Sequence, residues 1–460
     1  MSTLTRRQFL GRSAGLGGGL VLGAGSIDGL IARVALGSSF FEGHRAQAGR
    51  GEGGYGPLYP EGPELALPRG FTYRLIGVEG SPMSDGRVTP HAHDGMAAFA
   101  LPNGNIRLIR NHESRIVGSA ICDPEVAYDR KAEGGTTSLE IEPSRDREVV
   151  KELVSCGGTA VNCAGGPTPW GSWLTCEETT AGPGSGYEQP HGYVFEVPVG
   201  AEWAAEAVPL RAMGRFEHEA LAVDPETGIV YETEDLVVCG LYRFIPRERG
   251  NMSAGGRLQM LAIRDRPNYD TSAGQTVNEP LPVTWVDIED PDPADAETNR
   301  NAVAKQGWQQ GAAVFSRLEG CWWGRGNGSV YMSATTGGDA RLGQIWRYVP
   351  GDDGGRLMLA FESTSPDMLQ RPDNVTVSPR GGIVICEDGP GPQFVRGLTP
   401  EGRIFDFARN TMNNKEFAGA CFSPDGRTFF VNIQGDTRAG GAGHLGMTFA
   451  IWGLWEQGAL

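Results

Sequence analysis

Carboxylates recur along this chain at matching distances from six glycines in turn-like segments. The glycines are Gly104, Gly171, Gly228, Gly328, Gly382 and Gly426. The acids that precede a glycine by nine or ten residues are Asp94, Glu219, Glu319 and Asp373, and Cys163 stands eight residues before Gly171. The acids that follow a glycine by five to nine residues are Glu113, Glu177, Glu178, Glu234, Asp235, Glu387 and Asp388. This repetition indicates a shared site rather than scattered surface charge.

The residue types favour metal binding at that site. Crowded carboxylates repel one another, which raises their pKa values and destabilises the fold unless cations lie between them. Oxygen ligands suit calcium, whereas the thiolate of Cys163 suits a transition metal. His93, His112 and His218 directly precede acids of the repeat, and neighbours on a strand point to opposite faces. We therefore expect these histidines to pack behind the acids rather than to bind the metal.

The segments around the glycines are typical of β-hairpins, because a Gly or Pro turn precedes an alternating apolar run. The start of the first strand lies beside the end of the second, so the acids of each hairpin meet at one end. The glycines are 67, 57, 100, 54 and 44 residues apart, and propeller repeats typically span ~40–50 residues. The sequence thus predicts an all-β, six-bladed β-propeller with the acids at one mouth. A β-sandwich with irregular hairpins is the alternative.

Two parts of the repeat depart from this pattern. The longest interval holds an apparent insertion, residues 251–310, with an acidic, proline-rich run from Asp287 to Pro293. We expect this insertion to form an exposed loop or lid. The last hairpin offers Ala418 opposite Asn432 instead of acids.

The composition limits the partners and the fold class. Asp and Glu number 56 against 40 Lys and Arg, and a net charge of -16 disfavours nucleic acid as a partner. The 69 glycines disfavour a helical bundle. The eight cysteines are dispersed, so their pairing cannot be deduced. No stretch after the N-terminus reaches ~18 apolar residues, and we expect no permanent membrane anchor.

Residues 1–48 resemble a twin-arginine export signal. Arg6 and Arg7 precede a Gly/Ala/Leu segment, and a small-x-small site ends at Ala48. We expect cleavage after Ala48, which leaves residues 49–460 as a single propeller domain. The protein would then reach the periplasm or the exterior through the twin-arginine export machinery, and we expect a monomer. The alternative is an amphipathic first helix.

The element NCAGGPTPWGSWLTCEE (162–178) resembles the PhoX-type alkaline phosphatase family. The resemblance spans most of residues 55–435 in the same order. Its other elements are RNHE (110–113), HGYVFEVP (191–198), GRFEHEALAVDPETGIVYETED (214–235), LYRFIP (241–246), RLEG (317–320), RPDN (371–374) and ICEDG (385–389). It implies an exported six-bladed propeller that hydrolyses phosphoesters with iron (Fe3+) and calcium.

The resemblance also implies residue roles. It implies Cys163 and Glu178 as iron ligands, and it matches Glu219 and Glu319 to further metal ligands. Arg317 would contact the substrate phosphate, and Asn111 would be a second catalytic residue. The remaining implied ligands, for calcium or shared between ions, are Glu113, Glu177, Glu234, Asp235, Asp373, Asn374, Glu387 and Asp388.

The expected function is a metal-dependent phosphoester hydrolase with a small-molecule substrate. Beyond residues 1–48, no GxSxG, HExxH or P-loop motif offers another chemistry. Residues 149–161 form a more compact segment than the corresponding one in the longer members of this family. The resemblance therefore supports the set of metal ligands more strongly than it supports phosphatase activity. Two alternatives stay open: a calcium-dependent propeller hydrolase such as a lactonase, and a calcium-stabilised binding propeller without turnover. Cys163 separates them from the phosphatase, because a pure calcium site has no use for a thiolate.

Overall fold

The computed structural model describes residues 48–144 and 146–460. The described residues all belong to one compact unit, His44–Leu460. The predicted export signal therefore lies outside the described residues except for Ala48, which is buried and donates its N–H to the carbonyl of Ile404 (2.8 Å). No helix among the described residues is long and apolar enough to cross a bilayer.

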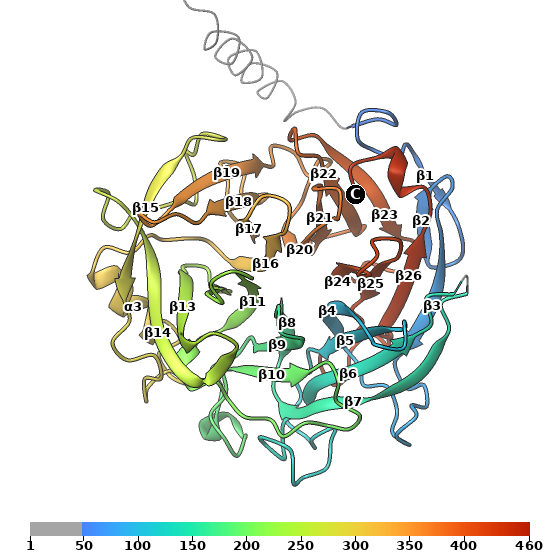
Figure 1. Ribbon diagram of the computed structural model, residues 1–460, viewed down its shortest axis with the longest axis horizontal. Coiled ribbons are helices and arrows are strands. Elements are labelled where there is room, and N and C mark those ends of the chain that lie inside the picture. The colour runs from blue at the N-terminus through green and yellow to red at the C-terminus, as the bar shows by residue number, and fades with distance from the viewer. Residues whose placement is uncertain (1–47, 145) are drawn as a thin grey trace, which may run out of the picture. The chain divides into compact units, whose positions relative to one another are not determined.

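Six antiparallel hairpins form the inner part of the described unit (Figure 1). They are β4 (His93–Ala100) with β5 (Ile106–His112), β8 (Asn162–Pro167) with β9 (Ser172–Glu177), β11 (His218–Val223) with β12 (Val230–Glu234), β16 (Leu318–Gly324) with β17 (Ser329–Ala334), β20 (Pro372–Val377) with β21 (Ile383–Glu387), and β24 (Phe417–Phe422) with β25 (Phe429–Ile433). The predicted hairpins are thus confirmed. One turn differs in detail, because its left-handed residue is Gly381 (φ 90°) rather than Gly382.

Further strands extend the hairpins outward. They are β1 (Leu58–Pro60), β2 (Leu65–Pro68), β3 (Thr72–Val78), β6 (Gly134–Ile141), β7 (Val149–Thr159), β10 (Val194–Pro198), β13 (Leu241–Glu248), β14 (Asn251–Ile263), β15 (Leu281–Asp287), β18 (Gln344–Val349), β19 (Arg356–Glu362), β22 (Phe394–Leu398), β23 (Ile404–Asn410) and β26 (Met447–Trp452). The helical elements among the described residues are α3 (Ala302–Gln309) and the short 3-10 turns η2 (Pro183–Ser185), η3 (Arg211–Met213) and η4 (Trp455–Gln457). The described unit is therefore all-β, as predicted.

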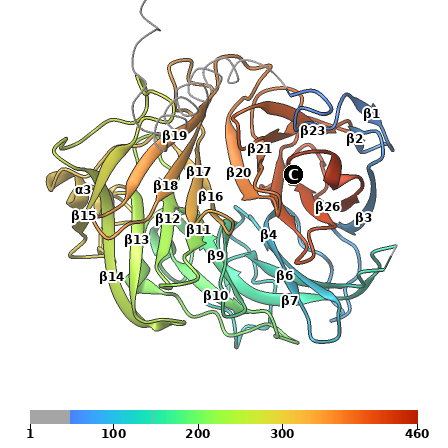
Figure 2. The ribbon, with the colours of Figure 1, turned by 45° about the horizontal axis from the view of Figure 1, so that its top comes forward.

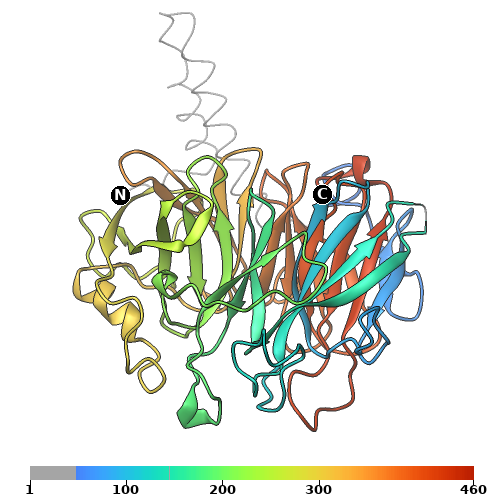
Figure 3. The same cartoon turned by 60° about the horizontal axis from the view of Figure 1, so that its bottom comes forward.

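The inner strands close a ring, which the β-sandwich alternative would not form. Each first strand contacts the next in the order β4, β8, β11, β16, β20 and β24, and β24 contacts β4 again. Figure 2 shows β16 beside β20, and Figure 3 shows the strands from the side. The described residues form five hydrogen-bonded sheets, because β15 pairs with β19 and joins two meanders into one nine-stranded sheet. The propeller-like arrangement is confirmed, whereas six separate blades are not.

The two ends of the described unit complete the ring. β3 pairs with β26, and β2 pairs with β23, so the first strands of the unit finish its last two sheets. Aromatic rings seal this junction: the ring of Phe71 lies 4.8 Å from that of Trp455 and 5.2 Å from that of Phe407. Such aromatic pairs add to the apolar area that the junction buries.

The insertion at residues 251–310 is not the simple loop that its composition predicts. It contains β14, β15 and α3, and α3 lies at the periphery of the described unit (Figure 1). The proline-rich run packs against neighbouring loops, because Asp292 accepts hydrogen bonds from Tyr193 and Arg211 (both 2.8 Å). The expectation of an exposed loop or lid is therefore corrected for most of the insertion, which β-strand pairing holds in place. The proline-rich run itself is a loop after β15, with Asp287, Glu289 and Asp290 exposed.

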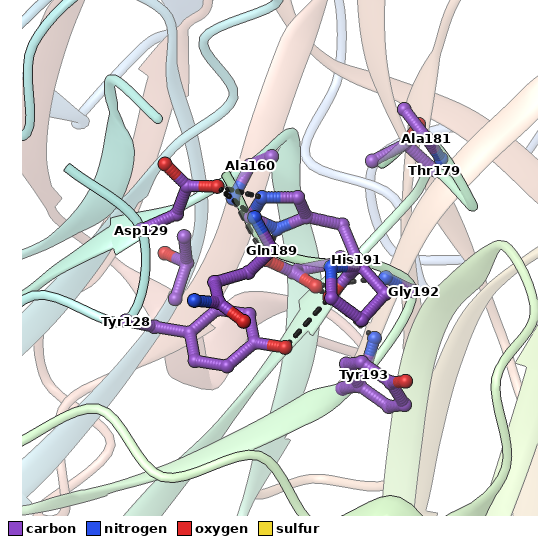
Figure 4. Close-up of polar contacts among 12 residues, drawn as sticks. Tyr128, Asp129, Ala160, Thr179, Ala181, Gln189, His191, Gly192 and Tyr193 are labelled. Atoms are coloured by element: carbon purple, nitrogen blue, oxygen red, sulfur yellow. Dashed lines mark hydrogen bonds and ion pairs between the residues drawn. The ribbon is translucent and has the colours of Figure 1, made fainter. Parts of the chain in front are cut away.

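A buried charged network ties together loops at one end of the inner strands (Figure 4). His191 lies between two carboxylates, with Nδ1 2.6 Å from Glu177 and Nε2 3.4 Å from Asp129. Glu177 also accepts the N–H groups of Ala160 and Gly192 (both 2.8 Å). Burial alone would lower the pKa of His191, but the charge and hydrogen bonds of the two carboxylates outweigh it and raise the pKa to about 9.

This network predicts a stability that falls at alkaline pH. A histidine with a pKa raised from 6.5 to about 9 contributes roughly 3 kcal/mol below pH 6.5, and this contribution is lost as the pH rises through 9. His191→Gln removes the charge and leaves two buried carboxylates without it, so we expect a loss of about 3 kcal/mol at pH 6.5. Urea unfolding of both proteins from pH 6 to pH 10 measures this difference.

His444→Gln is the matched control, because His444 is partly exposed and its Nδ1 lies 3.6 Å from Asp436. The control should follow the wild-type curve. Equal pH dependence in wild type and His191→Gln would show that His191 is neutral in the folded protein.

Candidate metal centre

A β-bulge at the start of each inner hairpin positions the repeated residues. The pairing register shifts between His93 and Met96, Asn162 and Gly165, His218 and Leu221, Leu318 and Cys321, Pro372 and Val375, and Ala418 and Cys421. The first residues within these shifts are Asp94, Cys163, Glu219, Glu319, Asp373 and Gly419. A bulge inserts one extra residue and re-aims its side chain. Five of the six hairpins thereby turn an acid or a thiol toward one place.

These side chains line a cavity of about 90 Å³. The lining residues are Asp94, Glu113, Arg115, Cys163, Glu178, Glu219, Arg317, Glu319, Asp373, Asp388, Glu416 and Gln434. Glu113, Glu178 and Asp388 each directly follow the last residue of the second strand of their hairpin. The cavity is therefore lined by residues at the start of the first strands and by residues just after the second strands, which antiparallel pairing brings side by side.

Three groups of potential ligand atoms adjoin one another in this cavity. Within each group the ligand atoms all lie within 4.8 Å of one another. The groups are Cys163 with Glu178 and Glu219, Glu219 with Glu319 and Asp373, and Asp373 with Asp388 and Glu416. Glu219 and Asp373 are each shared by two groups, so the donors form a continuous row. A row of shared carboxylates can bridge neighbouring cations.

The protein pays an electrostatic cost for this arrangement. Burial first, and the neighbouring carboxylates second, raise the pKa of Glu219 and of Asp94 well above the ordinary range. The same causes raise the pKa of Asp373 to about 7. Burial and the charge of Glu219 also raise the pKa of the Cys163 thiol. Without cations the raised pKa values favour the protonated forms, and bound cations would relieve the repulsion.

Two arginines form ion pairs with carboxylates in and beside the cavity. Arg317 donates from Nε (2.9 Å) and Nη2 (2.8 Å) to the two carboxylate oxygens of Asp235, and Nη2 also contacts Glu319. Nη2 of Arg115 lies 2.5 Å from Glu113 and also contacts Glu178. Burial alone would lower the pKa of Arg317, but Glu319 and Asp235 raise it, and the guanidinium stays charged.

Backbone strain accompanies the site. Ala92, Val161, Arg317 and Arg371 each stand two positions before a bulge residue and have φ values of 54°, 52°, 48° and 53°. Side chains rarely adopt this left-handed conformation, and it is most costly for a β-branched residue such as Val161. The carbonyl of Val161 accepts the N–H of Glu178 (2.9 Å). The strained residue Val161 thus helps to hold Glu178, which lines the cavity.

Small residues allow the inner strands to approach one another below the cavity. A Cβ atom on Gly95 would lie 2.5 Å from the Cα of Ala164, and one on Gly320 would lie 2.4 Å from the nitrogen of Val375. Side chains at these positions would force the ring open. The close approach therefore requires glycine directly after Asp94 and after Glu319.

Not every predicted site residue lines the cavity. Glu177, Glu234 and Glu387 precede Glu178, Asp235 and Asp388, and strand alternation turns them to the opposite face. Glu234 accepts from the N–H of Gly240 (2.9 Å) and the hydroxyl of Tyr242 (3.0 Å). Glu387 accepts from the N–H of Gln370 (2.7 Å) and lies 3.1 Å from Arg396. The structure places Glu177, Glu234 and Glu387 as supports for the surrounding loops.

The two predicted asparagines and Asp235 also lie outside the lining. Asn111 donates to the carbonyls of Cys163 (3.2 Å) and Ala164 (2.8 Å) and accepts from Trp173 and Thr175 (2.8 and 3.0 Å), so it fixes the bulge that carries Cys163. Asn374 donates to Asp373 (2.8 Å) and accepts the N–H of Gly419 (2.6 Å). Asp235 holds Arg317.

The structure adds cavity residues to those predicted as ligands. Asp94 belongs to the sequence repeat, and its spacing already placed it at the mouth. Gln434 follows Gly426 at a comparable spacing and donates to Asp94 (2.8 Å) and Glu113 (2.6 Å). Arg115 and Glu416 lie outside the regular pattern, and no sequence signal marked them.

The expectation for the histidines is confirmed. His93 hydrogen-bonds with Thr448 and the carbonyl of Pro90 (both 3.1 Å). His112 contacts the carbonyl of His91 (2.8 Å) and Thr137 (2.9 Å), and His218 contacts the carbonyl of Gly214 (3.1 Å). None of the three lines the cavity in the described part of the chain.

Comparison with known proteins places the chain in a family. Residues 53–436 match the family described as alkaline phosphatase PhoX. The structure is similar to that of Pseudomonas fluorescens PhoX in complex with vanadate, a transition state analogue, with a TM-score of 0.65, 18% sequence identity and coverage of 88% of this chain and 98% of that chain. No curated protein matches in sequence.

Other similar structures are more distant. A gluconolactonase from Xanthomonas campestris has a TM-score of 0.45 at 12% identity, covering 87% of this chain and 99% of that one. The periplasmic gluconolactonase of Pseudomonas aeruginosa has a TM-score of 0.38 at 14% identity, covering 86% and 97%. The family match covers most of the chain, and the chain therefore belongs to the PhoX family of alkaline phosphatases.

Proposed function

We propose that this chain is a metal-dependent phosphoester hydrolase that acts on small-molecule substrates. The observation that carries this proposal is the continuous row of donors, in which Glu219 and Asp373 each belong to two adjoining groups. Membership in the PhoX family supports the reaction class. A calcium-stabilised binding propeller could also use the carboxylates, but it has no use for the thiol of Cys163 within the row.

The donor types fit iron and calcium. The group of Cys163, Glu178 and Glu219 offers a thiolate with two carboxylates, which suits iron, and the other two groups offer oxygen atoms alone, which suit calcium. We assign iron to the first group and calcium to the other two. Bound there, such ions would neutralise phosphoryl oxygens and act as Lewis acids.

The chain itself positions the substrate and excludes bulk water. Asp235 fixes the guanidinium of Arg317, whose Nη1 has no partner among the described residues and can donate to a phosphoryl oxygen. The cavity walls are buried, with Asp94, Glu219 and Glu319 only 2–4% exposed. Apart from Cys163 and the carboxylates, which this proposal assigns to the ions and the arginines, the described lining residues offer no nucleophile, so we propose water as the attacking group.

We also propose a cellular location, which the N-terminal sequence supports. The resemblance of residues 1–48 to a twin-arginine signal supports export to the periplasm or the exterior. Folded export suits a protein that acquires its ions before it crosses the membrane. We expect the exported protein to act as a monomer.

Elemental analysis with a chromogenic phosphomonoester assay tests the proposal. The exported wild type should contain iron and calcium and should hydrolyse the ester. Cys163→Ser should lose iron and at least 100-fold of kcat/KM, because a hydroxyl is a poor substitute for a thiolate. Cys122→Ser, a buried cysteine away from the cavity, is the matched control. Calcium without iron, together with no ester turnover, would contradict the proposal.

Asp235→Asn tests the positioning of Arg317. The substitution removes the charge that holds the guanidinium fork, so we expect kcat/KM to fall about 10-fold, or about 1.4 kcal/mol of transition-state stabilisation, with the metal content unchanged. Steady-state kinetics and elemental analysis measure the two effects separately. Asp352→Asn, at an exposed aspartate, is the control. An unchanged kcat/KM would show that Arg317 needs no such support.

A further inference from the structure

We propose that Arg115 is a second phosphate-binding residue, which acts together with Arg317 across the cavity. This inference rests on the proposed function and deepens it. Neither the sequence pattern nor the resemblance marked Arg115. Four features of the structure carry the inference: the place of Arg115 in the ring, its remaining hydrogen-bond donors, its fixed backbone and its partial exposure.

The two arginines enter the cavity from opposite sides of the ring. Arg115 follows β5, in the hairpin that begins with β4, whereas Arg317 directly precedes β16. Around the closed ring the order is β4, β8, β11, β16, β20 and β24, so β4 and β16 are three strands apart in either direction. Both arginines line the cavity. A phosphoryl group held between them would be approached from two sides.

Arg115 keeps more donors available than Arg317 does. Arg317 commits Nε and Nη2 to Asp235, which leaves Nη1. Arg115 donates a hydrogen bond from Nη2 to Glu178, and Nη2 is also its nitrogen nearest to Glu113. Its Nε and Nη1 make no hydrogen bond within residues 48–144 and 146–460, and they provide three N–H groups. Arginine donors in this arrangement suit the oxygen atoms of phosphate.

The backbone around Arg115 is fixed before any ligand binds. The N–H of Arg115 donates to the carbonyl of Thr437 (2.9 Å), and the carbonyl of Ser114 accepts the N–H of Val161 (3.1 Å). The hydroxyl of Ser114 lies 2.9 Å from Nε2 of His91. A side chain on a fixed backbone loses less conformational entropy when it binds a ligand.

The exposure of Arg115 suits contact with a ligand that enters from solvent. The side chains of Arg115 and Arg317 are 29% and 26% exposed, whereas that of Glu113 is only 5% exposed. The arginines thus lie between the buried acids and the solvent. The competing explanation is that Arg115 only neutralises Glu113 and Glu178, in which case its loss would alter metal binding and nothing else.

Phosphate titration of the metal-loaded protein separates the two explanations. Arg115→Gln and Arg115→Lys are brought to the metal content of the wild type, and inorganic phosphate is titrated by calorimetry, which needs no turnover. We expect Arg115→Gln to raise the Kd for phosphate at least 10-fold and Arg115→Lys to raise it less, because lysine keeps the charge but not the planar donors. Arg403→Gln, at a partly exposed arginine outside the cavity lining, should bind phosphate as the wild type does.

Each other result contradicts the inference. An Arg115→Gln protein that binds phosphate with the wild-type Kd at equal metal content would show that Arg115 does not contact phosphate. An Arg115→Gln protein that folds, by circular dichroism, but cannot be loaded with metal, together with a metal-loaded Arg115→Lys protein that binds phosphate with the wild-type Kd, would show that Arg115 acts only through Glu113 and Glu178. A metal-loaded wild type that neither binds phosphate nor hydrolyses the ester would instead overturn the proposed function, and the inference with it.

Discussion

Mutual repulsion among buried carboxylates is the constraint on which the rest of this structure depends. Eight carboxylates and the thiol of Cys163 line a cavity of about 90 Å³. Burial and neighbouring charges raise the pKa values of Glu219 and Asp373 in the cavity, so the site is stable only with bound protons or bound cations. The row of shared donors offers places for the cations.

The ring resists this repulsion through its local geometry. Five of the six bulges aim an acid or a thiol into the cavity, and Gly95 and Gly320 let the strands approach closely enough to keep the cavity small. The buried network around His191 holds the loops beside Glu178 from behind, and Asn111 fixes the bulge of Cys163. The ligand positions are therefore set by contacts that lie outside the cavity, which is the preorganisation that a metal site needs.

The net charge of -16 would by itself repel an anionic substrate. Part of that charge lies in the cavity, where bound cations would reverse the local field. Arg115 and Arg317 lie between the acids and the solvent and add positive charge where a phosphate would enter. The acid surplus is thus compatible with phosphoester chemistry, because the charge that the substrate meets differs from the charge of the whole chain.

The sequence by itself determined the hairpins, because turn glycines and alternating apolar residues are local signals. It also placed Asp94, Cys163, Glu219, Glu319 and Asp373 at one end, since antiparallel pairing fixes which residues share an end. Only the tertiary structure decided which acid of Glu177 and Glu178 faces the cavity, because a shift of one residue at a bulge turns a side chain to the other face. The tertiary structure also placed Arg115 and Glu416 in the cavity lining and joined two meanders into one sheet. Both results depend on how parts of the ring that are far apart in the sequence meet.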